Sequence, residues 1–154
     1  MDSFEFMSPT KFILEKDADK LCGREVKKFS DKVLFVHYGD KFTYESGLHK
    51  RITDALSDAG VTCYELPGVE PNPKVELVRK GIALCRENQI GCVLAVGGGS
   101  VIDTAKAVAI GVKYDGDVWD FYSKKAVPET ALPIGTVMTL PATGSEGSNG
   151  SVLK

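Results

Sequence analysis

Three consecutive glycines and a serine follow a short apolar run, and this order of residues could bind a phosphate group. The run Cys92–Val96 has the apolar, β-branched composition of a strand that is buried on both faces of a parallel sheet. Gly97, Gly98 and Gly99 carry no side chains, so a ligand could come close to the backbone N–H groups there. Ser100 follows as an N-cap or first-turn hydroxyl of a segment with helical spacing, and a helix N-terminus favours an anion. The pattern favours a phosphate site over a turn that uses glycines for steric reasons alone.

The spacing of these glycines differs from that of the two commonest nucleotide-binding motifs. The chain has neither G-x-G-x-x-G at this place nor the G-K-[ST] ending of a P-loop. The pattern therefore disfavours an ordinary Rossmann dehydrogenase and a P-loop NTPase.

Two further loops carry polar groups that suit a dinucleotide. Asp40 follows the apolar run Val33–Tyr38 and a glycine, where an acidic side chain can accept hydrogen bonds from ribose hydroxyls and repel a 2′-phosphate. It could equally be an ordinary turn aspartate. The segment Thr139–Glu146 offers three hydroxyl groups that could bind a nicotinamide amide or a ribose. Taken alone, these hydroxyls are better explained as caps of turns.

Strand-like and helix-like segments alternate along most of the chain, which predicts an α/β fold with a mostly parallel sheet and helices on both faces. Ligands of such sheets bind beyond the carboxyl ends of the strands, so the three polar loops are expected to meet at one edge. We expect helices at 17–29, 44–59, 73–88 with Asn72 as N-cap, from the glycines to about 112, and a short one within 115–122. Strands are expected at 4–6, 11–14, 33–38, 61–66, 92–96, 132–139 and from 151 to the last residue.

Composition narrows the classes of function. The 154 residues are enough for one domain, and 43% of them are hydrophobic, as in an ordinary globular protein. The formal net charge is −2 and the basic residues are scattered, which gives no reason to expect nucleic-acid or membrane-surface binding. The chain has no apolar run long enough for a membrane span and its first residues lack the features of a signal peptide. We therefore expect a cytoplasmic location.

The metal-binding and redox residue types are sparse. Cys22, Cys63, Cys85 and Cys92 form no C-x-x-C pair, and we expect them to be free thiols. The two histidines, His37 and His49, have no acidic or thiol partner at ligand spacing in the sequence, so we expect no metal site from them.

Together the motifs resemble those of the iron-containing alcohol dehydrogenase family, and most closely its butanol dehydrogenase-type members. The resemblance is carried by GGGSVIDTAKAVA at 97–109 and LPATGSE at 140–146. The start FxFxxPTK, the VEPNP loop, the segment 116–120 and LPIxTVxT before the second motif add to it, so that it covers essentially the whole chain.

The resemblance implies that residues 1–154 form the N-terminal α/β domain, a Rossmann-like domain similar to that of dehydroquinate synthase, which holds most of the NAD(P)(H) site. It implies that the pyrophosphate lies at the glycine turn, with Asp103 in the same helix, and that the nicotinamide and its ribose lie along the second motif. Asp40 departs from the glycine-rich pattern of many butanol dehydrogenase-like members and is closer to that of NAD-using relatives, so NAD(H) is favoured over NADP(H). The residues so implied are Asp40, Gly97, Gly98, Ser100, Asp103, Thr139, Leu140 and Thr143.

The family's metal ligands, one aspartate and three histidines, belong to a C-terminal helical domain that these residues do not include. The resemblance thus implies a parent enzyme that uses Fe²⁺ or Zn²⁺ to transfer hydride between a small alcohol or aldehyde and the nicotinamide. We expect that parent to be a homo-oligomer. In this chain we expect no catalytic and no metal-binding residue, and the chain alone is expected to be inactive.

Two other interpretations remain. The chain could act only as a nucleotide-binding or self-associating module. It could also belong to an enzyme of the same fold that acts on phosphorylated substrates, which the LPATGSE segment disfavours.

Overall fold

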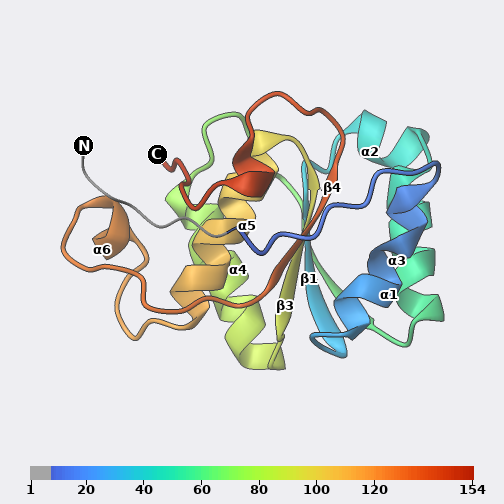
Figure 1. The fold of residues 1–154 in the computed structure, drawn as a ribbon. Helices are drawn as coiled ribbons and strands as arrows, with labels where there is room; N and C mark the ends of the chain where they lie inside the picture. Colours follow the sequence, from blue (N-terminus) through green and yellow to red (C-terminus); the bar gives the residue numbers. More distant parts are fainter. Residues whose placement is uncertain (1–7) are drawn as a thin grey trace.

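The structure is a computed structural model, which describes residues 8–154, and a parallel sheet lies at its centre (Figure 1). Its strands are β1 (Lys32–His37), β2 (Thr62–Leu66), β3 (Cys92–Gly97) and β4 (Ile134–Met138). They lie in the order β2-β1-β3-β4, and all neighbours are parallel. The α/β fold class predicted from the alternation of segments is confirmed.

The register of the sheet brings three strand ends to one level. His37 pairs with Val96, and Gly97 pairs with Met138. The chain therefore leaves β1, β3 and β4 at the same edge, as expected for the carboxyl ends of parallel strands.

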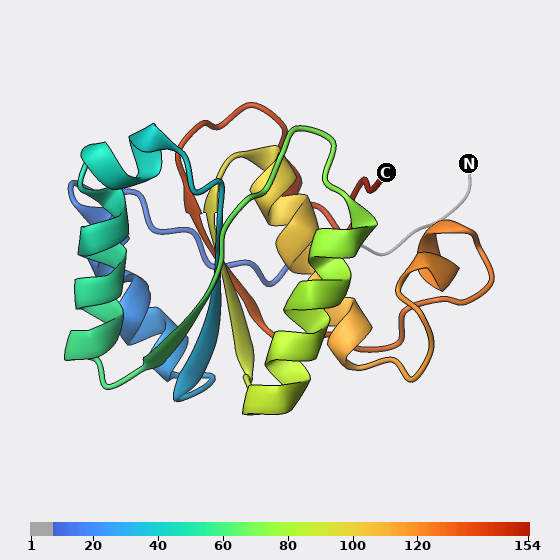
Figure 2. The same cartoon turned by 180° about the vertical axis from the view of Figure 1, so that it is seen from behind.

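Two long helices cover one face of the sheet, namely α4 (Val75–Asn88) and α5 (Gly99–Val112) (Figures 1 and 2). Their apolar side chains pack on the inward side chains of β1 and β3, among them Leu34, Val36 and Val93, and form the larger core. Most of the surface of α5 is apolar, and this allows the helix to pack on both α4 and β3.

The other face is covered by shorter helices: η1 (Ala18–Leu21), α1 (Cys22–Lys27), α2 (Lys41–Glu45) and α3 (Leu48–Asp58) (Figure 2). Val33, Phe35 and Leu94 point to this side and pack on Ile52 and Leu56 of α3. The remaining helical turns are α6 (Trp119–Tyr122) and η2 (Ser145–Gly147). Among residues 8–154, no helix has the length and apolar character that crossing a bilayer requires.

Several expected elements differ from the structure. The helix expected at 44–59 is two helices, because Gly47 adopts φ 77° and interrupts it. Asn72 is not the N-cap of α4, since it has φ 58° and the helix begins at Val75. The expected strand at 4–6 lies outside the described residues.

Two segments expected to be strands are irregular. Residues 11–14 have no strand partner and their apolar side chains are largely exposed. Residues 151–154 are not a strand either, although the backbone of Lys154 exchanges hydrogen bonds with Pro73 (2.9 Å) and Val75 (3.1 Å). In the second segment Leu153 packs against the larger core without entering the sheet, whereas Phe12 and Leu14 in the first are exposed.

We expect Gly23→Ala to destabilise the protein, because α1 and α3 pack closely there. A Cβ atom on Gly23 would lie 1.9 Å from the backbone oxygen of Ala55. Overpacking of this kind costs about 1–3 kcal/mol, whereas alanine in an exposed helix position gains about 1 kcal/mol over glycine. Urea unfolding measures the change, with Gly150→Ala as the control, because a Cβ there has no atom within 4 Å. An unchanged or increased free energy of unfolding in Gly23→Ala would contradict the close packing.

Candidate functional site

A cavity of about 730 Å³ lies at the carboxyl edge of the sheet, between the start of α5 and the loop after β4. Most of the residues predicted from the sequence line it: Gly98, Ser100, Asp103, Thr139, Leu140 and Thr143. Gly97 precedes the lining residues as the last residue of β3, and Asp40 lies outside the lining. Two of the three predicted loops therefore meet in one cavity.

The glycine turn joins β3 directly to α5. Gly98 is the N-cap, and its carbonyl oxygen accepts from the N–H groups of Val101 and Ile102, both at 3.1 Å. Ser100 is therefore a first-turn residue and not the N-cap. The first N–H groups of a helix have no acceptor within the helix, and Gly99 and Ser100 both line the cavity. The turn thus offers an anion the donors and the dipole that the sequence predicted.

The middle of the second motif packs on the glycine turn. A Cβ atom on Gly99 would lie 2.7 Å from both Cγ2 and Oγ1 of Thr143. Glycine at position 99 thus allows the loop after β4 to close against the start of α5. This packing role was not foreseen from the sequence, because the two residues lie far apart along the chain.

Two charged side chains of α5 hold the wall of the cavity. The Asp103 carboxylate accepts from Ser145 Oγ (2.7 Å) and from the backbone N–H of Val152 (3.1 Å). Lys106 Nζ donates to Ser145 Oγ (2.9 Å), Ser148 Oγ (3.2 Å) and the carbonyl oxygen of Gly150 (2.8 Å). Burial lowers the pKa of Lys106, while the charges of Asp103 and Glu146 oppose that shift.

The role of Lys106 was not predicted from the sequence, although its spacing from Asp103 indicated that the two share a helix face. Asp103 and Lys106 lie three residues apart, which places them on one face of a helix. The Asp103 carboxylate is hydrogen-bonded to the loop that lines the cavity, and its contact with the cofactor stays a prediction.

Asp40 caps a helix. It is the N-cap of α2, and its carboxylate accepts from the N–H (2.9 Å) and the Oγ1 (2.6 Å) of Thr43. These hydrogen bonds lower the pKa of Asp40, so the carboxylate stays ionised. The geometry fits the turn aspartate considered for this position, and the contact with ribose stays a prediction.

Tyr38 connects the loop after β1 with the glycine turn. It lines the cavity, and its hydroxyl oxygen would lie 3.1 Å from a Cβ atom on Gly98. Asp40 is therefore two residues from a cavity-lining side chain. Only its place at the end of a predicted strand pointed to Tyr38 in the sequence.

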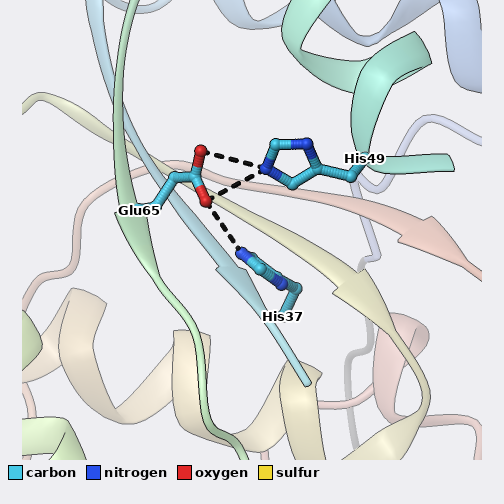
Figure 3. A group of neighbouring side chains, drawn as sticks. All are labelled: His37, His49 and Glu65. Atoms are coloured by element: carbon cyan, nitrogen blue, oxygen red, sulfur yellow. Dashed lines mark hydrogen bonds and ion pairs between the residues drawn. The ribbon is translucent and has the colours of Figure 1, made fainter. Parts of the chain in front are cut away.

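His37, His49 and Glu65 form a cluster on the other side of β1 (Figure 3). His37 Nε2 lies 3.3 Å from Glu65 Oε2, and His49 Nε2 lies 3.0 and 3.1 Å from the two oxygens. The fold thus supplies the acidic partner that the sequence spacing did not show.

The donor pattern of this cluster does not suit a metal ion. His37 Nδ1 accepts from the backbone N–H of Gly39 at 3.1 Å, so the ring carries its proton on Nε2 when neutral. A metal at Nε2 would need the opposite tautomer, with a proton on Nδ1 facing the Gly39 donor. Among residues 8–154 this is the only group of histidine, cysteine and acidic side chains gathered at ligand spacing, so the residues described do not fit the iron of the family considered above.

The cysteines are free thiols, as expected. Burial raises the pKa of Cys63 and Cys85 to about 12 and that of Cys22 and Cys92 to about 11. The thiols therefore stay protonated near neutral pH and are not suited to act as nucleophiles.

Comparison with known proteins agrees with the fold. The family model of iron-containing alcohol dehydrogenase matches residues 9–154. A probable NADH-dependent butanol dehydrogenase of Bacillus subtilis is 50% identical over 153 residues, which are 99% of this chain and 39% of that protein. The NADPH-dependent aldehyde reductase of Escherichia coli is 33% identical over 99% of this chain and 39% of its own length. The chain thus spans about two fifths of these relatives.

Solved structures give the same result. The crystal structure of NADH-dependent butanol dehydrogenase A from Thermotoga maritima matches with a TM-score of 0.87 and 39% identity, over 94% of this chain and 36% of that one. An iron-containing alcohol dehydrogenase of the same organism matches with a TM-score of 0.87 and 27% identity, over 98% and 42% of the two chains. With the match of the family model, these likenesses show that the chain belongs to the iron-containing alcohol dehydrogenase family.

Proposed function

We propose that this chain is the dinucleotide-binding domain of an NAD(P)-dependent alcohol dehydrogenase or aldehyde reductase, and that its cofactor is NAD(H). The observation that carries the proposal is the cavity at the start of α5, where the glycine turn and the loop after β4 meet. Its helix N-terminus supplies donors for a pyrophosphate. The family membership supports the same function.

In this proposal Gly97, Gly98 and Ser100 hold the pyrophosphate. Thr139, Leu140 and Thr143 lie along the nicotinamide and its ribose. Asp103 and Lys106 keep the loop after β4 in place through their hydrogen bonds. Bound NAD(H) would supply hydride acceptance or donation, and the residues of this chain bind and orient it.

We propose that alcohol activation takes place outside these residues. The histidine and acidic groups described here do not fit a catalytic metal, and the relatives are more than twice as long as this chain. A metal ion, Fe²⁺ or Zn²⁺, would then be held by a further domain of a whole protein, which we propose to be a homo-oligomer. In this proposal the chain alone binds the dinucleotide but does not oxidise an alcohol.

The choice of NAD(H) over NADP(H) depends on Asp40. The relatives include enzymes described as NADH-dependent and as NADPH-dependent, so family membership leaves the choice open. An ionised carboxylate after β1 repels a 2′-phosphate and can accept hydrogen bonds from ribose hydroxyls. The lowered pKa of Asp40 keeps that charge in place.

A self-associating module is the second candidate, because apolar side chains near both described ends are exposed. Phe12 is 67% and Leu14 101% exposed, and Leu140 and Val152 are each 65% exposed. Light scattering at rising protein concentration separates the two candidates. Dinucleotide binding by a monomer supports the first, whereas concentration-dependent association without binding supports the second.

We expect Gly98→Ala to weaken NAD⁺ binding about tenfold, which corresponds to about 1.4 kcal/mol. The added methyl group would occupy space beside the N–H groups of the helix start. The thermal stability should change little, because the nearest atom is the Tyr38 hydroxyl at 3.1 Å, at the end of a side chain that can move. Calorimetric titration with NAD⁺ measures the affinity. If the folded wild-type chain binds neither NAD⁺ nor NADP⁺, the proposed function is wrong. If Gly98→Ala binds NAD⁺ as tightly as the wild type, the glycine turn is not part of the binding site.

We expect Asp40→Asn to strengthen NADP⁺ binding about three- to tenfold, because it removes the charge that repels the 2′-phosphate. Asparagine is as good an N-cap as aspartate, so α2 should remain capped. Asp40→Ala is the matched comparison, since it removes the cap as well and should cost about 1 kcal/mol of stability. Titrations with NAD⁺ and NADP⁺ give the ratio of affinities. A ratio unchanged in Asp40→Asn would leave Asp40 with the capping role alone.

A further inference from the structure

His37 is a fully buried polar side chain whose two ring nitrogens are both engaged. Nδ1 accepts from the N–H of Gly39, and Nε2 contacts the carboxylate of Glu65, which also contacts His49 (Figure 3). None of these groups lines the cavity described above. The hydrogen bond to Gly39 nevertheless ties the ring to the turn that precedes Asp40.

The surroundings of His37 fix its ring in place. The ring of Phe35 lies 4.4 Å from it between centroids, and the ring of Tyr44 lies at 6.0 Å. The backbone that leads from the ring to Gly39 is also held, because His37 O accepts from Val69 N (3.3 Å) and Tyr38 O accepts from Gly68 N (3.1 Å). The Gly39 N–H is thus held next to Nδ1.

We propose that His37 is a positioning residue for the cofactor: its neutral ring holds the Gly39–Asp40 turn in the binding arrangement, and protonation of the ring releases that turn. The proposal rests on the proposed function, because the turn affects binding only if NAD(H) lies at this edge of the sheet. It assigns the His37–Glu65–His49 cluster a role that the cavity itself does not reveal.

The chemistry follows from the number of donors. A neutral ring offers one acceptor, and Nδ1 provides it to Gly39. A protonated ring has donors on both nitrogens, so Nδ1–H would face the Gly39 N–H and that hydrogen bond would be lost. Glu65 would still accept from Nε2–H. Protonation would therefore break the hydrogen bond to the turn and keep the one within the cluster.

The groups that face His37 act in opposite directions. Glu65 from β2 and Asp40 from the start of α2 favour the protonated ring, whereas His49 from α3 disfavours it, and the phenol ring of Tyr44 from α2 also faces it. Burial is the largest effect, and it lowers the pKa of His37 below its ordinary value of 6.5. The ring is therefore neutral at neutral pH, with the turn held.

The direction of the pH dependence follows. An unfolded chain binds a proton at His37 more readily than the folded one, so the contribution of His37 to stability is complete above pH 6.5 and is lost as the pH falls through the lowered value. Cofactor affinity should fall at the acid end of that window, where the ring of the folded chain itself takes up a proton and releases the turn. Both effects should be absent where the residue at position 37 does not titrate.

Two amide substitutions separate the two ring nitrogens. In His37→Asn the amide lies near the position of Nδ1, so its oxygen can accept from Gly39 without titrating. In His37→Gln the amide lies near the position of Nε2, so contact with Glu65 is kept and the acceptor for Gly39 is lost. His49→Gln is the control, because it retains a donor to Glu65 and does not touch Gly39.

NAD⁺ affinity is measured by calorimetry from about pH 8 downward until the ring of His37 in the folded chain is protonated, as followed by NMR. We expect the wild type and His49→Gln to lose affinity about five- to tenfold at the acid end, the size expected for one lost hydrogen bond. His37→Asn should bind without that loss, and His37→Gln should bind weakly at both ends. Equal pH dependence in the wild type and His37→Asn would overturn the proposal.

A readout without cofactor keeps this test separate from the proposed function. In the wild type, the ring nitrogen shifts of His37 and the hydrogen-exchange protection of the Gly39 amide are followed by NMR against pH. We expect a protonated Nε2 at neutral pH, and Gly39 protection that falls as His37 titrates. If the hydrogen-exchange protection of the Gly39 amide does not change as His37 titrates, the proposal is wrong. If NAD⁺ fails to bind at all, the proposed function fails, and the Gly39 amide still decides whether His37 holds the turn.

Discussion

The parallel pairing of β1 with β3 is the constraint on which the rest of the structure depends. Val33 to Val36 and Cys92 to Val96 are buried on both faces, so neither strand can slide without exposing apolar side chains. This register places His37, the last residue of β1, beside Val96, one residue before the end of β3. Met138, the last residue of β4, lies beside Gly97. The glycine turn, the Asp40 turn and the loop after β4 therefore start from a common edge.

The parts of the site that are local in sequence could be predicted. The apolar run, the glycines and the helical spacing after them are contiguous, so β3 and α5 were placed almost residue for residue. The break at Gly47 was missed, because a glycine inside a periodic pattern is compatible with a continuous helix. Contacts between distant residues could not be read at all: Asp103 with Ser145, Gly99 with Thr143, and Glu65 with both histidines depend on the register of the sheet.

The two sides of β1 carry different tasks in the proposed function. On the side of α5, side chains and helix-start donors line the cavity directly. On the side of α3, the histidines and Glu65 lie under the turn that leads to Asp40, so they act on the cavity only through the backbone of that turn. Sequence motifs indicate the first kind of residue, because their members are the groups that touch a ligand. The second kind emerges only from hydrogen-bond partners in the folded chain.

The tether between α5 and the loop after β4 also bears on the order in which the molecule opens. Ser145 lies 42 residues from Asp103, and most side chains of 139–154 are exposed, so few buried contacts oppose the separation of this segment. Closing so long a loop costs entropy, and regions with few buried contacts open below the global free energy of unfolding. The cavity wall is thus expected to open before the sheet beneath it unfolds. A bound dinucleotide would act against this partial opening, because only the closed wall completes its site.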